Sequence, residues 1–410
     1  MSVIDRPHRP HRPRMPQLLP TRSRRTHARR LGALSLGLLA ALGGLSATAS
    51  AASAPQAGHP QIHVGGFPTG MSLDPATDTV YVGNGTDNNL SLINGRTCNS
   101  VAVSGCGQHI VAVTAGTDPI GSVVDPSTNT IYAINASSGT VAVIQGGTCD
   151  AVNTTGCTNP PALIHIGAGP EFGALNPTTH TLYVANLDGN TVSVIDLRHC
   201  NAQNVTGCPQ AVVGVVHSGP YPFAVAVDVP SNTVYVTNDG TNTVTVINGR
   251  TCNATTHAGC SHTSREFVGL GPGGIAVDQR TNTVYVADET SSDVSMFSGA
   301  TCDSVNTSRC GLHAYRLVAG NGDRGIAVDD LTDSIYVANT SANTVLVFGG
   351  RACNGVVHTD CHFAVAHVGS SPRRVVVDEP TDTIYVSNAN SDSVSMINGR
   401  TCNGTVSAGC

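Results

Sequence analysis

Polar and apolar residues alternate in short runs along most of this chain. From Thr243 to Ile247 they take turns one by one, which is typical of a β-strand with one buried face. The same stretch of sequence predicts an inner strand at 223–227, a second strand at 233–236 and an outer strand at about 265–270, with polar turns between them. No helix of period 3.6 is evident after Leu45. The pattern therefore predicts a unit of four short strands.

One four-residue motif marks each copy of this unit. It reads Tyr-Val-x-Asn in most copies, and successive tyrosines lie 51, 51, 52, 50, 51 and 49 residues apart. The seven copies begin at Tyr81, Tyr132, Tyr183, Tyr235, Tyr285, Tyr336 and Tyr385. A period near fifty built from short strands indicates a propeller. We therefore predict an all-β, seven-bladed β-propeller of four-stranded blades.

The two ends of the repeat region complement each other. The last copy reaches Cys410 without an outer strand, whereas Gln61–Gly66 resembles the outer strands at 163–167 and 365–369. We expect the N-terminal strand to complete the last blade, which would remove the free sheet edges that favour aggregation.

Each copy also carries two cysteines separated by seven residues. The pairs are Cys98/Cys106, Cys149/Cys157, Cys200/Cys208, Cys252/Cys260, Cys302/Cys310, Cys353/Cys361 and Cys402/Cys410. Paired cysteines in an exported chain indicate disulfides, and residues in one loop already lie close together. Each bridge would restrict a loop of about nine residues and so stabilise the fold by about 2.5 kcal/mol. A zinc site needs four convergent ligands, so we expect no metal at these separate pairs.

The first 54 residues have a different composition from the rest. They hold nine of the 21 arginines, an apolar run from Leu31 to Leu45, and an Ala-Ser-Ala sequence ending at Ala51. This order is typical of a secretory signal, and the apolar run is shorter than the roughly 20 residues that a membrane span needs. We predict a signal segment at 1–54, a propeller at 55–410 and a secreted or cell-surface protein without membrane insertion. The sequence leaves the export route open.

The charge of the mature chain excludes one class of partner. After residue 54 there are 12 arginines, no lysine and 26 acidic residues, a formal charge of −14. Nucleic-acid binding depends on basic clusters that release counterions from phosphates, so no nucleic-acid partner is expected.

The literal Tyr-Val-Thr-Asn at 235–238 resembles the YVTN-type β-propeller repeats of surface-layer-like proteins. The resemblance extends over residues 61–410. It implies a seven-bladed propeller, and it implies either a cell-surface protein or a lactonase-like enzyme, because relatives of both kinds share these repeats.

Positions where the copies differ are candidates for function. An Asp or Asn caps a turn after each inner strand, and the residue five before each cap faces the mouth of the channel in a propeller. These residues are Thr69, Ile120, Glu171, Phe223, Gly273, Arg324 and Arg373. Asp323 and Arg374 flank two of them. We predict a ligand site formed by Glu171, Asp323, Arg324, Arg373 and Arg374, in which guanidinium groups bind a carboxylate or phosphate; the alternative is that these charges only neutralise one another in solvent.

Two functions follow from this sequence. The first is a monomeric, exported, disulfide-stabilised binding module for a protein or glycan of the cell envelope, acting without a cofactor. The alternative is a lactonase-like hydrolase or lyase at the channel mouth, with Glu171 as the base and Arg324 and Arg373 holding an anionic group. A convergent pocket around a Glu171 of raised pKa would favour the enzyme. No hydrolase, metalloprotease, phosphate-loop or dinucleotide motif is present.

Overall fold

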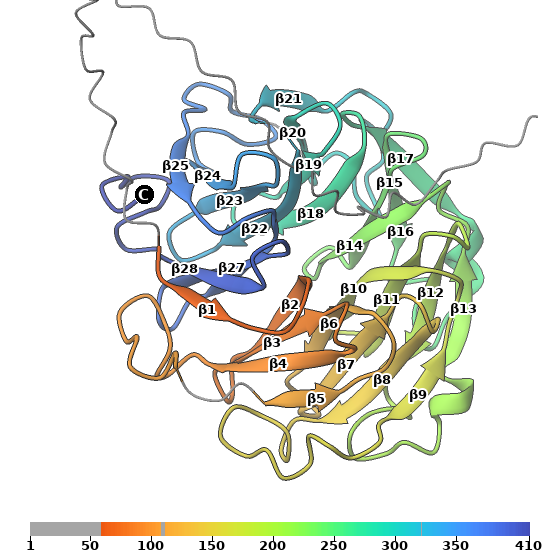
Figure 1. Cartoon of the computed structure of the whole chain (residues 1–410). Helices are drawn as coiled ribbons and strands as arrows, with labels where there is room; N and C mark the ends of the chain where they lie inside the picture. Colours follow the sequence, from red (N-terminus) through yellow and green to blue (C-terminus); the bar gives the residue numbers. More distant parts are fainter. Residues whose placement is uncertain (1–58, 108–110, 321) are drawn as a thin grey trace, which may run out of the picture. The chain divides into compact units, whose positions relative to one another are not determined.

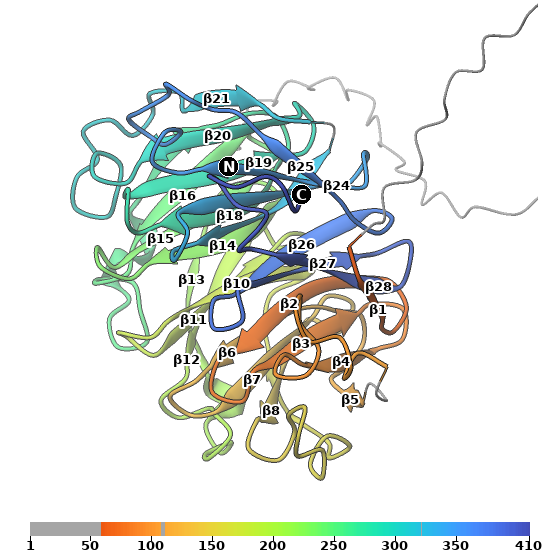
Figure 2. The ribbon, with the colours of Figure 1, turned by 90° about the vertical axis from the view of Figure 1, so that its left-hand side faces the viewer.

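The computed structural model describes residues 59–107, 111–320 and 322–410. The predicted signal segment lies outside these residues. In the described part, seven four-stranded antiparallel sheets follow one another around a ring (Figures 1 and 2). The innermost strand of each sheet contacts the innermost strands of both neighbours, and the first contacts the last. The predicted seven-bladed all-β propeller is confirmed.

The strands of each blade follow in chain order from the channel outward, except that blade 7 takes the N-terminal strand β1 as its outermost strand. Blade 1 comprises β2 (Pro68–Asp74), β3 (Thr79–Asn84), β4 (Asn89–Asn94) and β5 (Ala112–Thr114). Blade 2 comprises β6 (Pro119–Asp125), β7 (Thr130–Asn135), β8 (Thr140–Gln145) and β9 (Ala162–His165). Blade 3 comprises β10 (Pro170–Asn176), β11 (Thr181–Asn186), β12 (Thr191–Asp196) and β13 (Val212–Val216). Blade 4 comprises β14 (Pro222–Asp228), β15 (Thr233–Asn238), β16 (Thr243–Asn248) and β17 (Thr263–Phe267).

Blades 5 to 7 repeat this arrangement. Blade 5 comprises β18 (Pro272–Asp278), β19 (Thr283–Asp288), β20 (Asp293–Ser298) and β21 (Tyr315–Val318). Blade 6 comprises β22 (Asp323–Asp329), β23 (Ser334–Asn339), β24 (Thr344–Gly349) and β25 (Ala364–His367). Blade 7 comprises β26 (Pro372–Asp378), β27 (Thr383–Asn388), β28 (Ser393–Asn398) and β1 (Gln61–His63). The helices of the described residues are two 3₁₀ turns, η1 (Cys208–Gln210) and η2 (Ala258–Ser261), and none is long and apolar enough to cross a membrane.

The N-terminal strand closes the ring, as predicted. Strand β1 pairs antiparallel with β28, with Ile62 opposite Val394. In Figure 1 the orange β1 lies beside the blue β28. The strand is shorter than the predicted segment 61–66 because Gly65 and Gly66 follow it outside the ladder. The outer strand of blade 4 likewise begins and ends earlier than the sequence suggested, at Thr263–Phe267.

All seven predicted disulfides are present. They join Cys98–Cys106, Cys149–Cys157, Cys200–Cys208, Cys252–Cys260, Cys302–Cys310, Cys353–Cys361 and Cys402–Cys410. Disulfides persist in oxidising surroundings, so these bridges indicate an extracellular or periplasmic environment.

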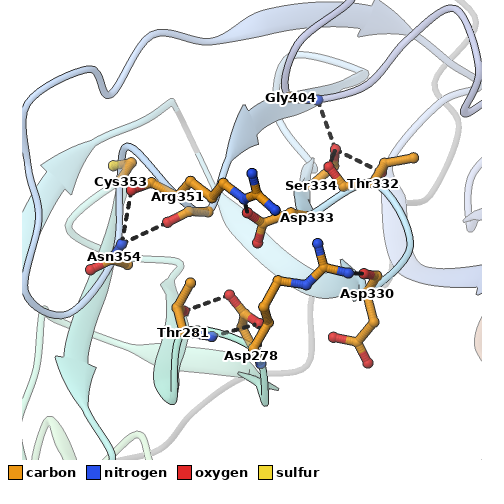
Figure 3. A network of polar contacts seen from close by, with 12 residues as sticks. Asp278, Thr281, Asp330, Thr332, Asp333, Ser334, Arg351, Cys353, Asn354 and Gly404 are labelled. Carbon is orange, nitrogen blue, oxygen red and sulfur yellow. Dashed lines mark hydrogen bonds and ion pairs between the residues drawn. The ribbon is translucent and has the colours of Figure 1, made fainter.

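Each motif tyrosine holds the disulfide loop of the next blade. Its buried hydroxyl donates to the carbonyl oxygen of that blade's first cysteine, at 2.5–2.9 Å. Tyr385 of blade 7 donates to Cys98 of blade 1, so the series continues across the closure. The first residue of the second strand in each blade is Thr or Ser, and its hydroxyl oxygen accepts a hydrogen bond from a backbone N–H of the same loop. Figure 3 shows this bond between Gly404 and Ser334, and its length is 2.7 Å. Burial raises the pKa of these tyrosines, so they remain protonated donors.

The motif asparagine ties two strands of one blade together. The Asn84 amide donates to Ser91 Oγ at 2.8 Å, and the Asn238 amide donates to Thr245 Oγ1 at 2.9 Å. Blade 5 has Asp288 at this position, fully buried and beside Asp293. Burial, with Asp293 adding to it, raises the pKa of Asp288 to about 8. Blade 5 therefore contains a carboxyl group that stays protonated at neutral pH.

Candidate functional site

The variable channel-mouth positions lie in irregular parts of the inner strands. Strand β10 loses its pairing register with β11 between Pro170 and Gly173, which leaves Glu171 and Phe172 outside the ladder. Strand β22 shifts at Arg324, and strand β26 shifts at Arg373. An extra residue in one strand leaves its side chain unpaired and re-aims it. These bulges turn the variable side chains towards the mouth.

One cavity of about 200 Å³ occupies this mouth. It is lined by Phe67, Thr69, Asp118, Ile120, Glu171, Phe172, Arg324, Arg373 and Arg374. The structure thus brings four of the five predicted site residues together, from blades 3, 6 and 7. The fifth, Asp323, begins β22, and its side chain lies outside the described part of the structure. The role of these residues as a ligand site stays a prediction.

Glu171 and Asp118 are the acidic groups that line this cavity. Glu171 is half-buried, and burial raises the pKa of its carboxyl to about 7, although Arg324 and Arg374 act in the opposite direction. Within residues 59–107, 111–320 and 322–410, no hydrogen bond or ion pair holds this carboxylate. A carboxyl group that titrates near neutrality can accept a proton from a neighbouring molecule and return it.

Three arginines surround the carboxyl group, and aromatic rings support each of them. The Arg374 guanidinium lies 3.5 Å from the centroid of the Phe172 ring. Arg324 lies 5.0 Å from the centroid of Phe223, and Arg373 lies 5.4 Å from that of Phe67. Stacking of this kind fixes a guanidinium plane and leaves its N–H groups free to bind.

The arginines differ in how their charges are compensated. Arg324 forms an ion pair with Glu289 at 2.6 Å, from Nη1 to Oε2. Arg373 Nε is buried and has no hydrogen-bond partner among the described residues. Burial and the charge of Arg324 lower the pKa of Arg373 to about 10 and that of Arg374 to about 9. Both remain cationic at neutral pH, and a bound anion would relieve the repulsion between them.

Arg374 also borders a second cavity deeper in the channel. This cavity has a volume of about 140 Å³ and shares Arg374 and Phe172 with the mouth. The rest of its lining comes from inner-strand residues such as Met71, Ile275 and Ile326. Arg374 therefore lies between the mouth and the deeper cavity and lines both.

The sequence did not identify every residue of this site. Phe67 and Asp118 precede inner strands in left-handed conformations, with φ of 55° and 59°. Glu289 follows the motif of blade 5, where the other blades have mostly small or neutral residues. Comparison of the copies at this repeat position could have identified Glu289 as a candidate by its charge. Glu289, which was not among the predicted site residues, forms the ion pair with Arg324.

Histidines of the outer strands lie in different blades. His63, His165 and His367 end the outer strands of three different blades, opposite Ser393, Thr140 and Thr344. In the described ranges, no three His, Cys, Asp or Glu side chains lie close enough together to hold a metal ion.

Comparison with known proteins agrees with this fold. The sequence profile of the family described as "Lactonase, 7-bladed beta-propeller" matches residues 79–408. Hydrazine synthase from Kuenenia stuttgartiensis is structurally similar, with a TM-score of 0.61 and 17% identity over 84% of this chain and 98% of that one. A streptogramin B lyase has a TM-score of 0.57 and 10% identity over 82% of this chain and 96% of that one. No curated protein sequence matches the chain. At these identities, the two structures support the fold alone.

Proposed function

Because the chain belongs to the lactonase family of seven-bladed β-propellers, we propose that it hydrolyses a lactone that carries an anionic substituent, in the channel-mouth cavity. The observation that carries this proposal is a carboxyl group of pKa near 7, Glu171, facing the same cavity as three guanidinium groups. The cavity volume of about 200 Å³ suits a small ring compound rather than a polymer.

Glu171 is the general base in this proposal. As a carboxylate it takes a proton from a water molecule while the water oxygen bonds to the lactone carbonyl carbon. The bond from that carbon to the ring oxygen then breaks, and Glu171 returns the proton to the departing oxygen. The product is a hydroxy acid, and the enzyme regains its starting state. A base with a pKa near the working pH suits both transfers.

The arginines bind charge in two places. Arg373 has an unused buried N–H, and it lies at the mouth, where it suits the anionic substituent. Arg374 lies deeper and is stacked on Phe172. Its N–H groups donate to the carbonyl oxygen when that oxygen becomes negatively charged in the tetrahedral intermediate. Donors already fixed in place stabilise such an oxyanion without reorganising during the reaction.

The test compares lactones of one ring size with and without a carboxylate substituent, by following acid release in a pH-stat. Glu171→Gln should lower kcat at least 100-fold and leave the KM nearly unchanged. Arg373→Gln should raise the KM for the anionic lactone and hardly affect the neutral one. Glu379→Gln is the matched control, because Glu379 is exposed and does not line this cavity. Equal turnover by wild type and Glu171→Gln would overturn the proposed role of the base.

The binding role predicted from the sequence stays a prediction. Saturable binding of the anionic lactone without turnover by the wild type would favour a binding module over an enzyme. A secreted or cell-surface location goes with either function, and immunodetection of the mature chain in culture fluid and cell envelopes tests it. Capture of an envelope protein or glycan from those fractions would test the partner.

A further inference from the structure

Equivalent cavities lie at the disulfide loops of blades 1 and 5. The two cavities have volumes of about 590 and 600 Å³. Most of their lining residues correspond at a constant offset of 204 residues, for example Ile62 to Glu266 and Leu92 to Met296. The cavity itself is therefore a product of the repeat, and only its side chains distinguish the two copies.

At four corresponding positions, the blade 5 cavity has ionisable side chains and the blade 1 cavity has none. The corresponding pairs are Ile62 and Glu266, Gly105 and Arg309, Val111 and Tyr315, and Thr154 and His358. Four small or uncharged positions have thus become a carboxyl group, a guanidinium, a phenol and an imidazole in one cavity. Repeated scaffold requirements do not explain this difference, because the blade 1 copy folds without these groups.

Glu266 is exceptional among the outer strands. It lies opposite Val244 in blade 4, at a position that the other blades fill with apolar residues. Those residues are Ile62, Val113, Ile164, Val216, Leu317 and Ala366. Glu266 is 1% exposed and contributes to the lining of the cavity. A buried carboxyl group at a core position costs stability unless something compensates it.

The compensation within the described protein is incomplete. Glu266 Oε2 accepts the backbone N–H of Gly311 at 2.8 Å. Glu266 Oε1 is buried and has no hydrogen-bond partner among the described residues. Burial raises the pKa of this carboxyl to about 7 despite the backbone N–H groups nearby. Glu266 Oε1 is therefore a buried hydrogen-bond acceptor without a donor among the described residues.

The remaining walls suit a flat apolar body. Tyr315 and His358 stack at the mouth with ring centroids 3.7 Å apart and planes inclined by 11°. Buried Met296 and Phe297 line the interior, and exposed Arg309 stands at the rim. Rings of this kind bind planar or apolar groups, and apolar surroundings strengthen a charge pair with the buried Glu266 carboxylate.

We propose that the blade 5 cavity binds an organic amine, with its ammonium group on the Glu266 carboxylate and a flat apolar body against Phe297 and the Tyr315–His358 pair. This site is separate from the channel mouth and does not depend on the lactonase proposal. The carboxylate supplies the charge that an ammonium group needs, and the unpartnered oxygen supplies its hydrogen bond. The ligand would compensate the otherwise costly burial of Glu266.

Three probes with a phenyl ring on a short chain test this site by isothermal titration and by NMR of the labelled protein. They are 2-phenylethylamine, 2-phenylethanol and 3-phenylpropionate. The wild type should bind the amine saturably and at least tenfold more tightly than the alcohol, and it should not bind the acid. Glu266→Gln, which keeps an acceptor for Gly311, should weaken the amine at least tenfold and leave the alcohol nearly unchanged.

Two further variants separate binding from folding. Tyr315→Ala alters an exposed wall residue and should weaken both the amine and the alcohol. Glu266→Ile restores the blade 1 residue and should abolish the preference for the amine. No saturable binding of the amine by the wild type would overturn the proposal, as would equal affinities in the wild type and Glu266→Gln. In either case Glu266 would act only as the acceptor that holds the loop at Gly311.

Discussion

Replacing Asp288 by Asn should stabilise the propeller, and the gain should grow with pH. Asp288 occupies the motif position at which the other six blades carry Asn. It is fully buried, and neither of its carboxyl oxygens has a geometrically good hydrogen-bond partner among the described residues. Asn is nearly the same shape and can donate to Ser295, as Asn238 donates to Thr245 in blade 4.

The magnitude follows from the pKa of the buried carboxyl group. Burial raises it from 3.8 to about 8. A raised pKa means that the stabilisation is complete below the unfolded value and is lost as the pH rises towards the folded one. The loss is about 1.4 kcal/mol per pH unit between these values, or at most about 4 kcal/mol at pH 7. Relaxation around Asp293 and Arg316 reduces this, so we expect Asp288→Asn to gain about 2 kcal/mol at pH 7.

Urea denaturation at pH 5, 7 and 9 measures this gain. The chain has no tryptophan, so tyrosine fluorescence and circular dichroism serve as probes. The difference between the variant and the wild type should be small at pH 5 and largest at pH 9. Asn238→Asp in blade 4 is the matched control and should destabilise with the same dependence on pH. A gain that does not change with pH would show that Asp288 is not protonated in the folded protein and would refute the reasoning.

Three further predictions concern the closure of the ring. Tyr385→Phe removes the hydroxyl that donates to the Cys98 carbonyl at 2.7 Å and leaves that acceptor buried, so thermal denaturation should show a loss of about 1–2 kcal/mol. Deletion of residues 57–66 removes β1 and should lower the Tm far more than loss of any single disulfide; equal Tm values would contradict closure by β1. Asp78→Asn should stabilise the protein more at pH 7 than at pH 5, because burial and Asp378 raise the pKa of Asp78 from 3.8 to about 6. Denaturation curves at both pH values check this sign.

The repeat made the fold predictable, and the same regularity concealed the sites. Tyrosine spacing predicted seven blades, and cysteine spacing predicted the disulfides, because each feature recurs at one place in every blade. Glu171 and Arg324 were found as departures from the repeat. Arg374 was named only as a neighbour, since its position deep in the channel depends on the bulge in β26 and on the Phe172 ring from blade 3. Contacts between distant blades leave no local signal.

Glu266 shows a different limit. The sequence places it in an outer strand among residues of mixed polarity, where nothing distinguishes it from its neighbours. Only the strand register reveals that its counterparts are buried and apolar. The predicted outer strand of that blade began two residues too late, at Arg265 rather than Thr263. Because outer strands have a weak polar and apolar pattern, the sequence alone did not identify Glu266 as a buried residue of the blade 5 cavity.

Through the hydrogen bonds from tyrosine hydroxyls to cysteine carbonyls, every repeat is both a donor and an acceptor. A copy contributes a hydroxyl to its successor and a carbonyl, fixed by its own disulfide, to its predecessor. Duplication of one whole repeat would thus carry a matched pair of connectors, and the new copy could join the ring without new complementary residues. A gene that starts and stops at a different disulfide loop would encode the same set of connections. The ring can therefore be lengthened or reopened by exchange of whole units, whereas half a unit would leave a buried carbonyl without its donor.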